Sequence, residues 1–120
     1  MKKKIKQSTL RNKLDVLWRE DVKQNAGFRC EKCGKQDGKH DCHHIFGKKA
    51  HPSVRFDVAN GAYLCVGCHK FNKGSAHETP KVFMDWIISK RGEVWYEDLL
   101  LRANQLQKVD KAALLESFKK

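Results

Sequence analysis

Cysteine residues in the middle of the chain stand at a spacing that is typical of metal ligands. Two Cys-x-x-Cys pairs occur, Cys30 with Cys33 and Cys65 with Cys68. This is the arrangement of a structural four-cysteine zinc site, because the turn within each pair directs both sulfurs at one ion. We therefore predict that the four cysteines bind one zinc ion, and that this ion supplies much of the folding free energy of residues 28–70.

The interval between the two pairs is longer than the usual interval of roughly 15–20 residues. An insertion between the pairs would explain the length, and His43 and His44 lie in it. The alternative is that the pairs are redox-active or merely buried, but the βαβ context of a thioredoxin-like site is absent. Cys42 is a fifth cysteine, for which we expect a small buried side chain rather than a metal ligand.

A second group of residues suits the hydrolysis of phosphodiester bonds. The run Asp41-Cys42-His43-His44-Ile45 precedes Asn60, and His69 follows directly after Cys68. Hydrolysis needs a base with a pKa near neutrality, and imidazole meets that requirement without large tuning. It also needs charge stabilisation at the phosphate, which a divalent ion can supply. The pattern therefore favours a phosphate-cutting site inside the zinc-binding region.

Over about residues 28–73, this order of residues resembles the HNH endonuclease motif in its zinc-ribbon form. The superfamily fold is a ββα-metal unit, in which two antiparallel strands and a helix hold one divalent ion. The resemblance implies that His44 is the general base, and that His43 and His69 are the metal ligands. Asn60 matches the residue that braces the loop between the strands and helps to orient the base. The stretch 83–106 faintly resembles the tail of phage recombination endonucleases.

His43 occupies a place where relatives often have Asp, and this difference bears on the metal. A neutral ligand leaves the ion more positive and favours transition metals, so the catalytic divalent cation could be Mg2+, Mn2+, Ni2+ or Zn2+. Neighbouring residues on a strand point to opposite sides, so we expect different roles for His43 and His44, with local twisting that brings both near one phosphate. The alternative for His43, His44 and His69 is a second zinc site, or hydrogen bonds within a zinc ribbon.

Further polar residues are candidates for contacts with the nucleic-acid backbone. Charge-assisted hydrogen bonds from Arg and Lys position such a backbone, and a solvated surface role is equally open for these residues. The two outlying histidines, 51 and 77, could approach the phosphate or assist the metal, but we prefer a polar surface role for both. The candidates are Arg55, Lys70, Asn72, Lys73, His51 and His77.

The charge of the chain agrees with a nucleic-acid partner. The sequence has 25 Lys and Arg against 14 Asp and Glu, which gives a net charge of +11. Such a charge predicts a polyanionic partner, here DNA, although a solvated lysine surface is the simpler alternative. No apolar stretch approaches the ~20 residues of a membrane span, and no signal-peptide region follows the basic start. We expect a cytoplasmic protein in a reducing compartment, with a phage or mobile-element origin suggested by the resemblance alone.

The chain, at 120 residues, is long enough for a single domain with one modest core. We predict an α+β fold with a small zinc-stabilised ββα-metal core and flanking α-helices. A basic tail at residues 1–7 precedes a helix at 8–27, the core spans 28–74, and further helices cover 79–118.

Periodicity and capping residues place these elements more closely. Ser8 or Thr9 is expected to cap the first helix and Gly27 to end it. Thr79 and Pro80 suit the start of a later helix. Strands are expected at 41–46 and 61–64. Helices are expected from 65 or 66 to 73, from 80 until Gly92 stops it, over 93–107, and in a short segment that Asp110 caps.

These features predict a metal-dependent HNH endonuclease that hydrolyses DNA phosphodiester bonds, as a monomer or weak dimer. His44 would deprotonate water, and the ion held by His43 and His69 would stabilise the phosphate. The resemblance implies 5′-phosphate and 3′-hydroxyl products. Two other classes remain open, a non-catalytic zinc ribbon that binds nucleic acid and a zinc-ribbon assembly factor that binds protein. Divalent-dependent cleavage and salt-sensitive DNA affinity separate the three.

Overall fold

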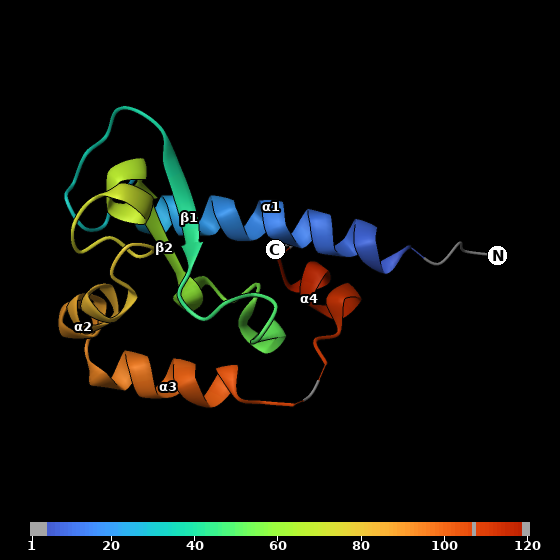
Figure 1. Cartoon of the computed structure of the whole chain (residues 1–120). Helices are drawn as coiled ribbons and strands as arrows, with labels where there is room; N and C mark the ends of the chain where they lie inside the picture. The colour runs from blue at the N-terminus through green and yellow to red at the C-terminus, as the bar shows by residue number, and fades with distance from the viewer. Residues whose placement is uncertain (1–4, 107, 119–120) are drawn as a thin grey trace.

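A two-stranded antiparallel sheet lies at the centre of the fold, with helices on both sides (Figure 1). The computed structural model describes residues 5–106 and 108–118, and the predicted α+β class is confirmed. The helices are α1 (Gln7–Asn25), α2 (Pro80–Arg91), α3 (Glu93–Ala103) and α4 (Lys111–Phe118), and the strands are β1 (His40–His44) and β2 (Gly61–Cys65). In the described part of the chain, no helix combines the length and the apolar character that a membrane crossing needs.

Helix α1 covers one face of the sheet with an apolar stripe at helical spacing. The stripe consists of Leu10, Leu14, Trp18 and Val22, all of which are buried. The predicted cap is wrong, because the helix begins at Gln7 and Lys6 takes the N-cap position. The carbonyl of Lys6 accepts from the amides of residues 9 and 10, so the helical turn starts before either hydroxyl residue. At the other end α1 stops at Asn25. The glycine that was predicted to end the helix, Gly27, follows two positions later with a φ of +65°.

The register of the sheet sets which side chains share a face. His40 pairs with Cys65 and His44 pairs with Gly61. Side chains alternate along β1, so Cys42 and His44 turn toward α1, whereas His43 turns away from it. The first strand ends at His44 rather than at residue 46, because Asn60 takes over as hydrogen-bond partner. Its carbonyl accepts from the amide of residue 45, and its side chain accepts from the amide of residue 46.

The segment after β2 is a π-helical turn, Gly67–Phe71, rather than the expected α-helix to residue 73. The amide of Asn72 donates to the carbonyl of Gly67, which closes the wider turn. The chain then reverses, so that the amides of residues 76 and 77 donate to the carbonyls of residues 68 and 69. Gly74 stands in this reversal with a φ of +88°. The turn therefore brings His77 beside His69, which are eight positions apart in sequence.

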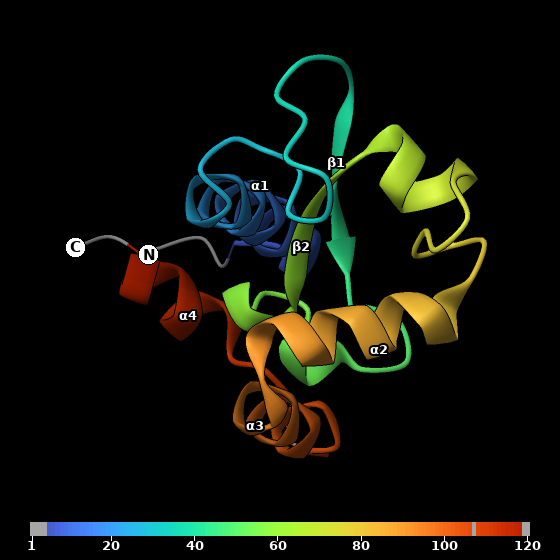
Figure 2. The same cartoon turned by 90° about the vertical axis from the view of Figure 1, so that its left-hand side faces the viewer.

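Helix α2 covers the other side of the sheet, and α3 lies against the loop between the strands (Figure 2). The start of α2 at Pro80 and its end before Gly92 agree with the prediction. Thr79 holds the cap position, but its hydroxyl donates to the carbonyl of Ser75 instead of capping the helix.

Helix α3 ends at Ala103, earlier than predicted, because side chains of the loop between the strands satisfy its last carbonyls. Ser53 Oγ donates to the carbonyl of Arg102, and His51 Nδ1 donates to that of Ala103. The predicted last residue, 107, lies outside the described residues. The carboxylate of Asp110 accepts from the amide of Ala113, as expected for the cap of α4.

Gly61 lies where β2 comes closest to α1. A Cβ atom at this position would clash with Cγ2 of Val22 and lie 2.9 Å from Cζ2 of Trp18. Both neighbours are buried and have little freedom to move. The absence of a side chain at residue 61 is therefore a condition for the packing of the sheet on the helix.

We predict that Gly61→Ala destabilises the protein by about 1–3 kcal/mol, because the added methyl group overpacks this contact. Urea unfolding of the zinc-loaded protein measures the loss. Gly47→Ala is the matched control, since a Cβ atom at residue 47 would have no neighbour within 4 Å, and it should unfold close to the wild-type midpoint. Equal stability of the two variants would contradict the packing argument.

Candidate functional site

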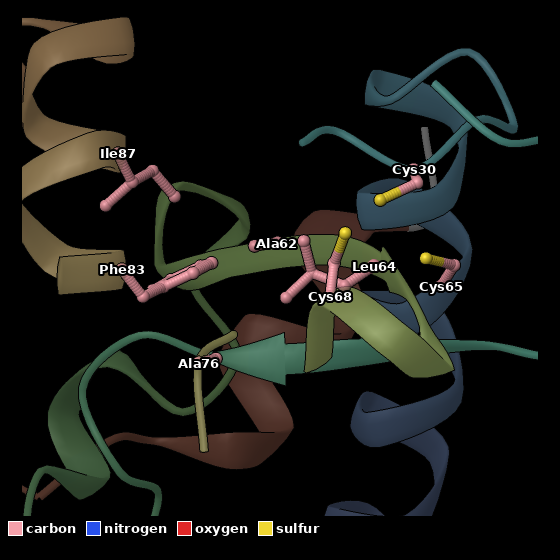
Figure 3. Packing of buried hydrophobic residues seen from close by; sticks show 8 residues of the cluster. All are labelled: Cys30, Ala62, Leu64, Cys65, Cys68, Ala76, Phe83 and Ile87. Atoms are coloured by element: carbon pink, nitrogen blue, oxygen red, sulfur yellow. The ribbon is translucent and has the colours of Figure 1, made fainter. Parts of the chain in front are cut away.

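The four cysteines of the two pairs form one cluster at an end of the sheet. Their sulfur atoms all lie within 4.8 Å of one another, and Cys33 Sγ is 3.6 Å from Cys65 Sγ. Cys30 and Cys33 come from the turn after α1, Cys65 ends β2, and Cys68 belongs to the π-helical turn. Figure 3 shows the sulfurs of Cys30, Cys65 and Cys68 gathered on the same side of the core. The cluster could hold a structural metal ion such as zinc, as predicted.

The electrostatics of the cluster suit a bound cation. Burial alone would raise the pKa of Cys30, but hydrogen bonds from the amides of Cys33, Cys65 and Lys32 lower it to about 6. Burial and the neighbouring Cys65 thiol raise the pKa of Cys68. Several thiolates this close would repel one another, and Zn2+ is the ion that four sulfur ligands prefer. The donor set therefore fits zinc.

A half-buried ion pair fixes the first cysteine pair to the rest of the fold. The guanidinium of Arg91 donates to both carboxylate oxygens of Glu31 and to the carbonyls of Ala59 and Gly61. The amide of Glu31 also donates to the carbonyl of Tyr63 in β2, at 2.8 Å. Sequence reasoning missed this pair, because no local pattern connects positions 31 and 91.

Three histidines form a second cluster, on the face of the sheet away from α1. His43 lies on β1, His69 on the π-helical turn and His77 in the loop before α2, and each offers a ring nitrogen within 4.8 Å of the others. The Nε2 atoms of His69 and His77 are 3.0 Å apart. Burial lowers the pKa of His43 to about 3, and the nearby His69 and His77 add to the shift. Neutral imidazoles with free lone pairs are what a metal ion requires, so the donor set fits a divalent cation.

Asp41 orients the second ring of this cluster. His69 Nδ1 donates to Oδ2 of Asp41 at 3.0 Å, so the Nε2 atom of His69 carries the lone pair. Burial lowers the pKa of His69, and the carboxylate of Asp41 opposes that shift. A carboxylate behind a histidine is the usual support of a metal-binding imidazole. The sequence contained Asp41 beside the histidine pair, but nothing in it indicated this contact.

His77 is the cluster member that sequence reasoning placed on the surface. Its side chain is exposed, yet its ring centroid lies 4.5 Å from that of His69 and 5.5 Å from that of His43. His77 is thus a surface residue that also belongs to the cluster, because the backbone pairing of residues 76–77 with 68–69 carries it there.

His44 lies on the opposite face of β1 from His43. Its ring stacks on Trp18, with centroids 4.0 Å apart and planes at 8°, and its Nε2 donates to the carbonyl of Arg55 at 2.9 Å. Among the described residues, no hydrogen-bond partner is found for its Nδ1. Burial lowers the pKa of His44, which favours the neutral ring. His44 is therefore a neutral imidazole with one unshared lone pair, on the opposite face of β1 from the histidine cluster.

Asn60 braces the loop between the two strands. It is fully buried, and its side chain accepts from the amide of Phe46 while donating to the carbonyls of Phe46 and Val54. These bonds fix the chain directly after His44. This bracing is what the resemblance implied for the residue.

The remaining candidates differ in how free their side chains are. Arg55 makes two hydrogen bonds to the carboxylate of Asp15, at 3.1 and 2.8 Å, and His51 donates to the end of α3. Three others have exposed side chains close to the histidine cluster in sequence: Lys70, Asn72 and Lys73. Cys42 is half-buried, its thiol donates to the carbonyl of Arg19, and it lies outside the four-cysteine cluster.

Comparison with known proteins finds no family model that matches the chain, and no curated protein or solved structure that does so. The chemistry of the site is therefore argued from its own residues.

We predict that Cys65→Ser loses zinc and lowers the free energy of unfolding by more than about 3 kcal/mol, a fraction of the ~10–16 kcal/mol that structural zinc can contribute. Metal analysis and urea unfolding measure the two effects. Cys42→Ser is the control, since it removes the thiol outside the cluster and should keep its zinc. Unchanged zinc content and stability in Cys65→Ser would exclude the structural role.

We predict that Asp41→Ala weakens divalent-metal binding by the histidine cluster about 10–100-fold, because His69 loses the partner that sets its tautomer. Calorimetric titration of the zinc-loaded protein with Ni2+ or Mn2+ measures this affinity. Asp37→Ala removes an exposed carboxylate from the loop that precedes β1 and serves as the control. Equal affinity of both variants would show that Asp41 does not support the cluster.

Proposed function

We propose that this protein is a metal-dependent HNH endonuclease that hydrolyses phosphodiester bonds of DNA. The observation that carries the proposal is the cluster of His43, His69 and His77, together with a separate imidazole, His44, on the opposite face of β1. An antiparallel pair of strands followed by a short helical turn supports the ββα-metal architecture that the sequence resembles.

The histidine cluster would hold the catalytic divalent cation through three ligands instead of the two that the sequence indicated. When bound, the cation supplies positive charge against the negative charge that develops on the phosphate during hydrolysis. Three imidazoles favour transition-metal ions over Mg2+, because Mg2+ prefers oxygen ligands. Asp41 keeps the lone pair of His69 directed into the cluster.

His44 acts as the general base. Its Nε2–H is held by the carbonyl of Arg55, so its Nδ1 carries the lone pair that accepts a proton from water. Stacking on Trp18 fixes the plane of the ring, and Asn60 fixes the chain that follows it. Because burial keeps the ring neutral, the base is ready at neutral pH without prior loss of a proton.

The alternation of β1 separates these two roles. His43 and His44 are neighbours in sequence but face opposite sides of the sheet, so the base does not compete with the ligands for the metal. The substrate phosphate then has to reach both faces at the end of β1. Exposed Lys70 and Lys73 are suited to phosphate contacts on the side of the histidine cluster.

A second candidate is a non-catalytic zinc ribbon that binds nucleic acid. The four-cysteine cluster and the net charge of +11 would serve it equally well. It provides no reason, however, for three histidines supported by Asp41, and we therefore favour the nuclease.

We predict that His44→Ala lowers the rate of plasmid cleavage by about 10²–10⁴-fold, the usual contribution of a general base. The fold and the zinc content should remain, because His44 is outside the cysteine cluster. The assay follows nicking of supercoiled plasmid in Mn2+, Ni2+ or Mg2+.

The matched control is His40→Ala, which removes a histidine from the other end of the same strand. His40 hydrogen-bonds to carbonyls of its own loop and stacks on Tyr63. It should cut at nearly the wild-type rate. Cleavage by His44→Ala at the rate of His40→Ala would remove His44 from the role of base.

A further inference from the structure

A groove with a volume of about 630 Å3 lies outside both metal-binding clusters. It runs between the N-terminal half of α1, the loop that precedes β2 and the connection from α3 to α4. Figure 1 shows α4 beside this half of α1, and contacts of Leu115 with Leu10 and Leu14 hold the two helices together. The groove is therefore a product of tertiary packing rather than of one element.

The lining of the groove is strongly basic. Four cations contribute to it, Arg11, Arg55, Lys108 and Lys111, and none of the described residues that line it is acidic. Hydroxyl and amide side chains, from Ser8 and others, complete its polar surface. A concave surface with one sign of charge concentrates counter-ions, so the groove favours an anionic occupant.

Among the described residues, most of the cations that line the groove have no carboxylate partner. In the described residues, no carboxylate forms an ion pair with Arg11 or Lys108, and Lys111 Nζ contacts only the neutral oxygen of Gln7 at 3.4 Å. Arg55 alone has an acidic partner, Asp15, which lies outside the groove lining. Three of the four cations are therefore available to a ligand.

Arg55 connects the groove with the histidine site. Arg55 is one of the residues that line the groove, and its backbone carbonyl accepts the hydrogen bond from Nε2 of His44. The wall of the groove consequently includes the residue that holds His44. A linear polyanion in the groove would pass next to this position.

We propose that the groove binds the sugar-phosphate backbone of the DNA, and that it guides the strand to His44. This inference rests on the proposed nuclease function. Several separate cations along one groove suit a chain of phosphates better than a single phosphate group. Arg, Lys, Ser and Gln are the side chains that contact DNA backbones without reading sequence. Binding at the groove is accordingly expected to be independent of base sequence and strongly dependent on salt.

The test is a triple variant in which Arg11, Lys108 and Lys111 are replaced by Gln. Fluorescence anisotropy with a labelled duplex measures affinity for DNA without an added second metal, at salt from about 50 to 200 mM. We expect a loss of about tenfold or more. The slope of log K against log salt should become less steep by ~0.9 for each phosphate contact removed.

The control triple variant replaces Arg29, Lys35 and Lys39 by Gln. It removes the same charges from exposed positions beyond the other end of α1. It should bind DNA nearly as the wild type does, and thermal melting should show both variants folded. Equal DNA affinities of the two triple variants would overturn the groove assignment.

Two further outcomes separate the inference from the function on which it rests. If the wild-type protein cuts plasmid and the groove variant binds DNA normally, the groove assignment is wrong and the nuclease proposal stands. Wild-type protein that neither binds nor cuts DNA would overturn both. A groove variant that loses affinity for poly-glutamate but not for DNA would assign the groove to an acidic peptide instead.

Discussion

The antiparallel pairing of β1 with β2 is the constraint on which the rest of the structure depends. Its register places His43 opposite Ala62 and His44 opposite Gly61, so the bulky rings face small residues across the sheet. The alternation of the strand then sends one ring to each face. A shift of the register by one residue would exchange the two faces and place His43 against α1.

A sheet of two strands is not stable alone, and the elements that stabilise it also build the site. Trp18 covers one face and stacks on His44, while Phe83 of α2 covers the other and contacts His43. The cysteine cluster closes one end of the sheet, and Asn60 closes the other. The side chains that stabilise the sheet therefore also position the site residues, which explains how a chain of this size can hold two candidate metal sites.

The parts of the site that local spacing determines could be predicted from the sequence. The cysteine quartet follows from two tight pairs, and the bracing by Asn60 followed from the resemblance. The position of His77 could not be predicted, because it depends on the π-helical turn and on the chain reversal at Gly74. The contact between Arg91 and Glu31 was also hidden, since it joins segments far apart in sequence through tertiary packing. Sequence patterns report neighbours along the chain, whereas these contacts arise only when α2 packs on the sheet.

We propose that the cysteines hold a structural ion and that the histidines hold a catalytic one. The most direct measurement follows metal content and plasmid cleavage in the same samples, while a second divalent metal is titrated into zinc-loaded protein. We expect a folded protein that is inactive with zinc in the cysteine cluster alone and that gains cleavage in proportion to occupancy of the histidine cluster. Full cleavage before the second metal binds, or full occupancy of the histidine cluster without cleavage in any metal, would contradict it.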